Sequence, residues 1–400
     1  MRHFPFLLLC ALPFAADAQT LTEAEALRLG LARPEFAELQ RAHVEEAEAN
    51  ALGAGTWTNP TLEFGRDKLG TERERSWQIS QPFDLSGRRD LREDAARHRV
   101  RASEADNRGR RDERAATLRR AFHDTLRLQE AQRAVGAWAQ RFAVIDGIVA
   151  KLARAGEVAG YDRRRLAREQ RSAEARLAET RAELERGRAR LAGLLGKEAG
   201  DSFPTLAGPL LPEAPPPLPE LQGKLAARPE FAALAARAEA AQADNAAAQR
   251  NFPELTLGVG GKRVADGPLR DNGNTVMLSF SLPLFDRQQA GDRRSAAQAM
   301  AARAELGLAR QQAEGELLGL HRQATQLAAA AARYRSEAVA PSTELLRIAE
   351  SAYRAGESGV LELLDAYKGA LEAELTALDL EAKARMARIE LDQLTGNHPQ

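Results

Sequence analysis

The hexapeptide Ala32-Arg33-Pro34-Glu35-Phe36-Ala37 occurs a second time, unchanged, at positions 227–232. Three further pairs of segments match in the same order at an offset of about 200 residues: 59–62 with 252–255, 81–84 with 282–286, and 154–157 with 354–357. A single match would be expected by chance, but four matches in register indicate that the chain is an internal duplication.

The spacing of apolar side chains predicts the same parts in each copy. A helix near Pro34 or Pro229 comes first, because proline is tolerated in a first helical turn. Leu62 and Phe64 alternate with small or charged residues, which is the period of a strand. From Leu128 to Leu152 apolar residues recur every three or four positions, as in a coiled coil. The predicted strands lie at about 60–66, 76–83, 254–260 and 275–283, and the predicted long helices at about 87–155, 160–195, 287–355 and 359–394.

Four segments follow from this pattern. Residues 1–18 have a basic start, an apolar run and a small-x-small site ending at Ala18, which predicts a removed signal peptide. Repeat 1 then covers 19–199, and repeat 2 covers 223–400. The proline-rich segment 200–222 between them is predicted to be an extended linker. Cys10, the only cysteine, lies in the signal segment, so no disulfide is expected. A lipoprotein is the less favoured alternative, because Leu9 is not small.

The composition excludes several function classes. Lysine and arginine number 57 and so do aspartate and glutamate, so no net charge attracts nucleic acid. The six histidines are scattered without metal-ligand spacing, and no nucleophile or dinucleotide motif occurs. We therefore predict no enzyme activity, no cofactor and no fixed metal site.

Two β-hairpins give the chain only four strands. Four strands leave two unpaired edges and cannot close a barrel, whereas a membrane barrel needs about eight strands or more. If the strands cross a membrane, several chains must therefore contribute to one barrel. The alternative is a pair of hairpins in an ordinary soluble sheet.

Two segments carry a resemblance to a known family. Residues 353–366 (YRAGESGVLELLDA) are similar to the second helical tip of TolC-type outer-membrane efflux channels. Residues 78–89 (QISQPFDLSGRR) resemble the strand-to-helix turn of the heavy-metal, cobalt–zinc–cadmium (CzcC-like) branch. The resemblance covers the mature chain. It implies a mainly α fold in which three chains form one twelve-stranded membrane β-barrel, continued by a long α-helical barrel.

The resemblance also implies partners and a location. The homotrimer would lie in outer-membrane lipid with a large periplasmic extension. A periplasmic adaptor and an inner-membrane pump, of the resistance–nodulation–division (RND) type, would deliver its substrates. The alternatives are the outer-membrane conduit of a type I protein secretion system and a periplasmic coiled-coil scaffold without a pore. The cargo is left open, because the pump selects it.

The family keeps its periplasmic end closed by acidic side chains, and Glu362 and Asp365 fall on the matching positions. They are three residues apart, so they share one helix face. A solvated helix face is the alternative. The predicted tip turns, which an adaptor would contact, contain Gly156, Glu157, Gly160, Asp162, Gly356, Glu357 and Gly359. Trp57 and Trp77, placed near strand ends, are predicted to join an interfacial aromatic belt, with core packing as the alternative for Trp57.

Overall fold

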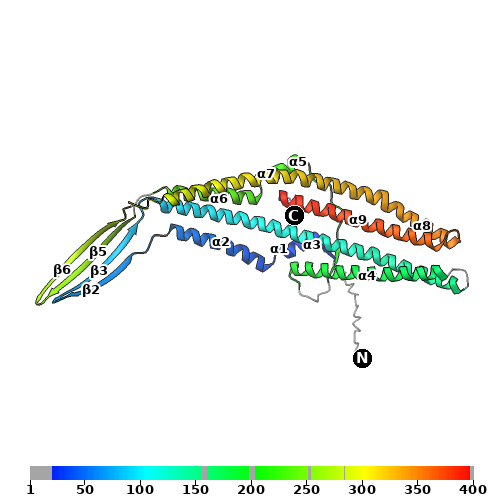
Figure 1. Cartoon of the computed structure of the whole chain (residues 1–400), viewed down its shortest axis with the longest axis horizontal. Helices are drawn as coiled ribbons and strands as arrows, with labels where there is room; N and C mark the ends of the chain where they lie inside the picture. The colour runs from blue at the N-terminus through cyan, green and yellow to red at the C-terminus, as the bar shows by residue number, and fades with distance from the viewer. Residues whose placement is uncertain (1–19, 155–159, 198–202, 251–253, 283, 397–400) are drawn as a thin grey trace, which may run out of the picture.

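The computed structural model describes residues 20–154, 160–197, 203–250, 254–282 and 284–396. A β-sheet lies at one end of an elongated molecule, and the tips of two helical hairpins lie at the other (Figure 1). The elements are β1 (Thr20–Thr22), α1 (Glu23–Leu31), α2 (Pro34–Gly55), β2 (Thr61–Leu69), β3 (Glu72–Phe83), α3 (Arg88–Arg154), α4 (Gly160–Leu195), β4 (Thr205–Ala207), α5 (Leu218–Ala226), α6 (Pro229–Ala248), β5 (Leu255–Asp266), β6 (Leu269–Phe280), α7 (Gln289–Tyr334), the π-helix η1 (Arg335–Val339), α8 (Ala340–Ala355) and α9 (Val360–Thr395).

Both β-hairpins turn through two residues. Leu69 pairs with Glu72, and Asp266 pairs with Leu269. Gly70 and Gly267 occupy these turns at φ of 60° and 58°, a region that glycine adopts without strain. The predicted strand bounds leave residues 67–75 and 261–274 as polar loops, and this part of the prediction is wrong. The apolar alternation stops there, but the backbone ladder continues through charged residues, so all four strands are longer than predicted.

The two copies are joined strand to strand. β3 of the first copy pairs antiparallel with β5 of the second along its whole length, from Glu72 opposite Asp266 to Phe83 opposite Leu255. The sheet order is β2-β3-β5-β6. Among the described residues, the outer edges of β2 and β6 have no partner strand. The hairpins thus form one continuous sheet with two open edges.

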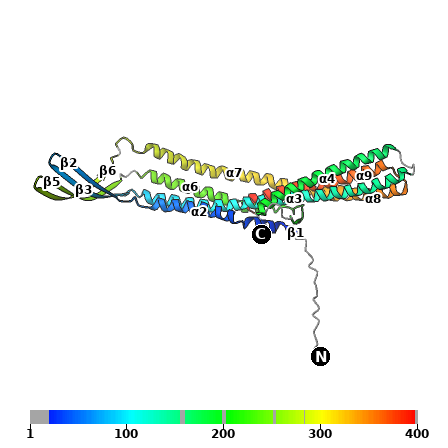
Figure 2. The ribbon, with the colours of Figure 1, turned by 90° about the horizontal axis from the view of Figure 1, so that it is seen from below.

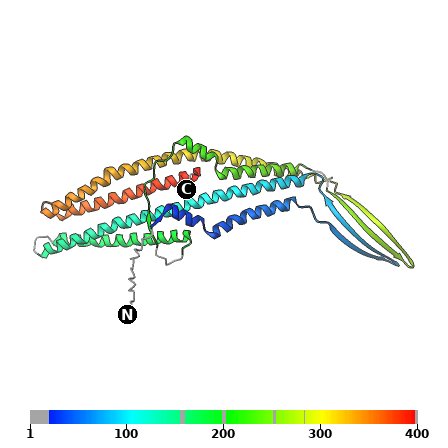
Figure 3. The same ribbon diagram turned by 180° about the vertical axis from the view of Figure 1, so that it is seen from behind.

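Along each of the long helices α3 and α7, two shorter helices pack one after the other. α2 and α4 both pack against α3, and α6 and α9 both pack against α7 (Figures 2 and 3). The predicted coiled-coil stripe of α3 is buried at Val135, Trp138, Phe142, Ile145 and Val149. This burial confirms that the spacing of three and four residues marks the packed face of a helical hairpin.

The long helix of the second copy is not continuous. Five residues of π-helix separate α7 from α8, whereas α3 in the first copy is uninterrupted. Pro341 is the second residue of α8 and cannot donate the backbone hydrogen bond that an α-helix requires at this point. Arg335, the first π residue, donates to Glu381 at 2.7 Å and to Glu374 at 2.7 Å on α9. The prediction of one helix over 287–355 was wrong in this respect.

The proline-rich segment is more ordered than an extended linker. Residues 205–207 form β4, which pairs in parallel with β1, and α5 begins at Leu218. The buried Arg385 of α9 donates to the backbone oxygens of Pro209, Leu210 and Leu211. The guanidinium therefore satisfies carbonyl groups that have no partner strand. No sequence period marks this contact.

Among the described residues, no helix is both long and apolar enough to cross a bilayer.

Candidate functional site: the sheet and the helical tips

One face of the sheet is apolar. The register aligns Leu62, Ile79, Val259 and Val276 in a single row across all four strands. All four side chains are exposed in the single chain, and Val276 is 83% exposed. Neighbouring rows add the exposed residues Phe64, Leu257, Leu278 and Phe280 to the same face. A broad exposed apolar face of this kind is typical of a surface covered by lipid or by another protein.

The other face of the sheet is polar and acidic. Side chains alternate across a strand, so Glu63 and Gln78 face opposite to Leu62 and Ile79. Nearer the hairpin turns, the register places Asp67 directly opposite Glu74 on this face, and Asp271 lies in the same row. Glu74 forms an ion pair with Lys262 at 2.6 Å. The two faces therefore have opposite character, as expected of a wall between lipid and water.

The two predicted belt tryptophans lie at different levels. Trp57 precedes β2, where Phe83 meets it edge-on at 6.0 Å and the guanidinium of Arg89 lies 4.2 Å from its ring centroid. Trp77 lies in the middle of β3, because that strand begins at Glu72. Its predicted place at a strand end is therefore wrong. Both tryptophan residues are 49% exposed, and their part in an interfacial belt stays a prediction.

The tip of the second copy is shaped by its glycines. Gly356 ends α8 at a φ of 76°, and the amide of Glu357 donates to the carbonyl of Ala352 at 2.9 Å. This is the usual left-handed end of a helix. Gly359 then caps the start of α9. The expected turn is present at residues 356–359.

The two predicted gate residues are exposed on α9. Glu362 accepts a hydrogen bond from the amide of Gly359 at 2.6 Å, so this carboxylate also caps the helix. Asp365 lies one turn further along the helix. The spacing alone did not reveal that Glu362 has a structural role as well. Their position in a pore stays a prediction.

Part of the first tip lies outside the described residues, namely Gly156, Glu157 and the side chain of Asp162. Gly160 is the first residue of α4 and is exposed.

An apolar cluster joins the two tips. It includes Phe142 of α3, Leu166 of α4, Leu346 of α8 and Leu363 of α9. Tyr367 of α9 also belongs to it and donates its hydroxyl hydrogen to Glu350 of α8. Burial and this hydrogen bond raise the pKa of Tyr367. The two hairpins therefore share a core near their tips.

An ion pair at the edge of this core crosses from one copy to the other. Lys368 of α9 lies 2.7 Å from Glu169 of α4, whose side chain is only 8% exposed. Hydrogen bonds from Lys368 and from Arg168 hold the pKa of Glu169 below its ordinary value. The sequence analysis missed this pair, because residues 199 positions apart in two copies show no spacing pattern.

A second charged cluster lies where α1, α3 and α9 meet. Arg119 is buried between Glu23 at 2.5 Å and Asp392 at 3.1 Å. Burial raises the pKa of Glu23, but the hydrogen bond and charge of His123, together with Arg119, outweigh it and lower this pKa to about 2. Burial lowers the pKa of His123 itself. The cluster joins α1 to α3 of the first copy and to α9 of the second copy.

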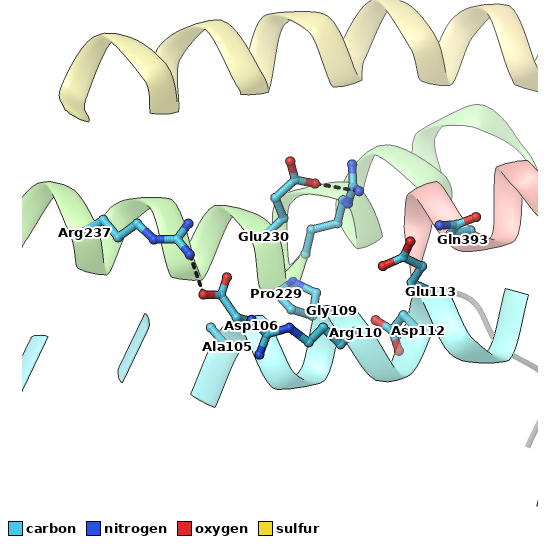
Figure 4. Close-up of a pocket in the computed structure, with 12 residues that line it drawn as sticks. Ala105, Asp106, Gly109, Arg110, Asp112, Glu113, Pro229, Glu230, Arg237 and Gln393 are labelled. Atoms are coloured by element: carbon cyan, nitrogen blue, oxygen red, sulfur yellow. Dashed lines mark hydrogen bonds and ion pairs between the residues drawn. The ribbon is translucent and has the colours of Figure 1, made fainter. Parts of the chain in front are cut away.

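A polar pocket of about 370 Å³ opens between α3, the start of α6 and the end of α9 (Figure 4). Arg237 of α6 pairs with Asp106 of α3, and Arg228 pairs with Glu230 at 2.7 Å. The described residues contain no group of three or more histidine, cysteine, aspartate or glutamate side chains able to hold a metal ion. We assign the pocket a role in joining the helices.

Known proteins with a similar sequence or a similar fold include outer-membrane and metal-resistance proteins. Residues 221–397 match the family model of outer membrane efflux proteins. The cobalt-zinc-cadmium resistance protein CzcC of Cupriavidus metallidurans is 26% identical over 356 residues, which cover 88% of this chain and 84% of CzcC. The nickel and cobalt resistance protein CnrC of the same species is 28% identical, over 77% of this chain and 76% of CnrC. The outer membrane protein VceC of Vibrio cholerae has the same fold, with a TM-score of 0.76 and 19% identity over 94% of this chain and 96% of VceC.

The sheet, the long helices and these matches are those of TolC-type outer-membrane efflux channels. Within that class the chain is a homologue of the CzcC-like outer membrane factors. Its place is the outer membrane, with the helices extending into the periplasm. The predicted mainly α fold of the TolC type is confirmed, and neither the secretion conduit nor the scaffold without a pore is favoured. The closed twelve-stranded barrel of three chains stays a prediction, because the sheet of one chain has open edges.

Proposed function

We propose that three copies of this chain form one channel, which a periplasmic adaptor and an RND-type pump load with divalent metal cations. The observation that carries the proposal is the four-stranded sheet with open edges at β2 and β6 and an apolar face. Pairing β6 of one chain with β2 of the next would satisfy both edges, and three chains would supply twelve strands.

The chain allows a clean test of the trimer. Cys10 is its only cysteine and lies in the predicted signal segment, so introduced cysteines are the only thiols of the mature chain. Pairs of cysteines, one on the edge strand β2 and one on β6, should cross-link neighbouring chains into a ladder that ends at three. A matched pair on the central strands β3 and β5, such as Ile79→Cys with Val259→Cys, should cross-link only within a chain. A ladder ending at any other number would refute the trimer.

Cation cargo is supported by the sign of the charges along the proposed path. Asp67, Glu74 and Asp271 lie on the polar face of the sheet, and Glu362 and Asp365 lie at the tip. Rings of carboxylates attract cations. CzcC and CnrC are named for resistance to divalent metals, which agrees with this sign.

Two experiments test this part. A strain lacking the gene should become sensitive to cobalt, zinc or cadmium and should recover when the chain is restored, whereas an unchanged metal sensitivity would refute the cargo. In planar bilayers, Glu362→Gln with Asp365→Asn should weaken block by divalent cations. Glutamine at 362 keeps the oxygen that accepts from Gly359, so this substitution removes charge without removing the cap. Unchanged cation block would refute the gate assignment.

The turns at the two helical tips are proposed to contact the adaptor. They contain Gly156, Glu157, Gly160, Asp162, Gly356, Glu357 and Gly359. Gly356 adopts a positive φ at the far end of the molecule from the sheet. Cross-linking from Glu357→Cys to a co-expressed adaptor tests this contact, with Glu254→Cys near the sheet as the control.

A further inference from the structure

The apolar face of the sheet ends in a row of arginines. Beyond Phe64 and Trp77 on the same face, the register places Arg66 opposite Arg75 and Arg75 opposite Arg263. We call these three residues the arginine row. Two residues further along each strand, Lys68, Arg73 and Arg270 follow on the same face. Six cations are thus gathered on one face, next to the hairpin turns.

The charges are sorted by face. At the same level, the opposite face carries Asp67, Glu74 and Asp271. Among the described strand residues of that face, the one cation is Lys262, which forms an ion pair with Glu74. The sheet end is therefore not simply basic, because its basic side chains point the same way as the apolar rows and its acidic ones point the opposite way.

The arginine row has no acidic partner among the described residues. Arg66, Arg75 and Arg263 are all exposed, and none of them forms an ion pair with a described carboxylate. Arg263 donates to the amide oxygen of Asn272 at 2.7 Å, which leaves its charge uncompensated. Like charges on directly opposed strand positions destabilise a sheet. An external anion would remove this cost.

The level of the row indicates where that anion lies. From Phe83 to Trp77 the apolar part of β3 measures roughly 20 Å, at about 3.3 Å per residue. Charged side chains on the lipid face of a barrel are costly at the bilayer centre and cost little near the interface. Arg75 therefore belongs at headgroup level. Because the hairpin turns lie at the end of the molecule opposite the helical tips, this level is that of the outer leaflet (Figure 1).

We propose that the arginine row binds the phosphate groups of phosphorylated lipids in the outer leaflet. Arginine matches phosphate with a planar fork of two donors, which suits it to this ligand. The proposal goes beyond the transport of cations, because the row faces away from the proposed pore. A neighbouring chain cannot cover it, since Arg75 and Arg263 lie on the central strands β3 and β5, whose neighbours belong to the same chain.

The test uses the full-length protein in neutral detergent with three probes: bis-phosphorylated lipid A, the same lipid without phosphates, and inorganic phosphate. Trp77 lies one row from Arg75 on the same face, so its fluorescence reports binding. Lipid A should bind, and the combined variant Arg66→Gln, Arg75→Gln and Arg263→Gln should bind it at least tenfold more weakly. The matched control is the triple substitution to glutamine at Arg108, Arg176 and Arg181, which are exposed on α3 and α4; it removes the same charge and should bind as the parent does.

Three outcomes would overturn the proposal. They are equal binding by the triple variant, equal binding of the lipid without phosphates, and full displacement of lipid A by millimolar inorganic phosphate, which would indicate a general anion site. The triple lysine variant at the same positions keeps the charge and loses the fork, so it should bind two- to fivefold more weakly; parental affinity would refute the role of the fork. Metal resistance should be unaffected by these variants, which separates this proposal from that of the cargo.

Discussion

The ion pair between Lys368 and Glu169 predicts how firmly the two tips are held together. Lys368→Met removes the contact of 2.7 Å and leaves Glu169, with its 8% exposed side chain, only the hydrogen bond from Arg168 at 2.8 Å. A hydrogen bond between charged groups contributes about 1.5–3 kcal/mol. Lys368 is 45% exposed, so solvent screening reduces the value to about 1 kcal/mol.

An energy of about 1 kcal/mol corresponds to about a fivefold change in an equilibrium between joined and separated tips. We expect the proposed channel to open by separation of these tips, because they form the end of the molecule opposite the sheet. Single-channel recording in planar bilayers should therefore find Lys368→Met open about five times as often as the parent. Glu169→Gln should act in the same direction, and combining the two should add little, because both remove the same contact.

The control is an ion pair of the same chemistry that stays within one helix. Lys383 lies 2.7 Å from Asp379 on α9, and both side chains are more than half exposed. Lys383→Met should leave the open fraction unchanged. The reasoning is refuted if Lys383→Met opens the channel as much as Lys368→Met does, or if the effects of Lys368→Met and Glu169→Gln simply add.

Three further predictions concern stability, each read from thermal unfolding in detergent. Gly356→Ala forces a side chain into a φ of 76° and should cost about 1 kcal/mol, whereas Gly369→Ala, inside α9 with open space around it, should be neutral or stabilising. Arg119→Leu leaves Asp392 buried with fewer partners and should cost about 3 kcal/mol; a loss below 1 kcal/mol would contradict the buried network. The pKa of Glu23 lies at about 2 in the folded chain against an ordinary 4.5, so its contribution is present above pH 4.5 and is lost as the pH falls towards 2. About 2 kcal/mol should disappear in that window after allowance for its 23% exposed side chain, and Glu23→Gln should flatten this part of the pH profile.

The sequence by itself determined the plan of the chain. The matched segments established the duplication, and the apolar periods located the helical hairpins and the strands. The packed stripe from Val135 to Val149 was predictable because a coiled coil has to bury one side of each helix, and that requirement is written locally, every three or four residues. The turn at Gly356 was predictable because its positive φ selects glycine, which is also a local requirement.

Only the tertiary structure decided which distant residues meet. The pairing of β3 with β5 places Arg75 beside Arg263, and it turns scattered charges into a basic face and an acidic face. The charged ends of the strands have no apolar alternation, so the sequence pattern predicts loops there, whereas the backbone hydrogen bonding between strands continues through them. The contact of Lys368 with Glu169 likewise depends on how two packed hairpins are placed, not on any local pattern. The spacing of apolar residues within a segment determines whether it forms a helix or a strand. The register between two elements depends on backbone pairing and on a shared core, and both of these require residues from two segments.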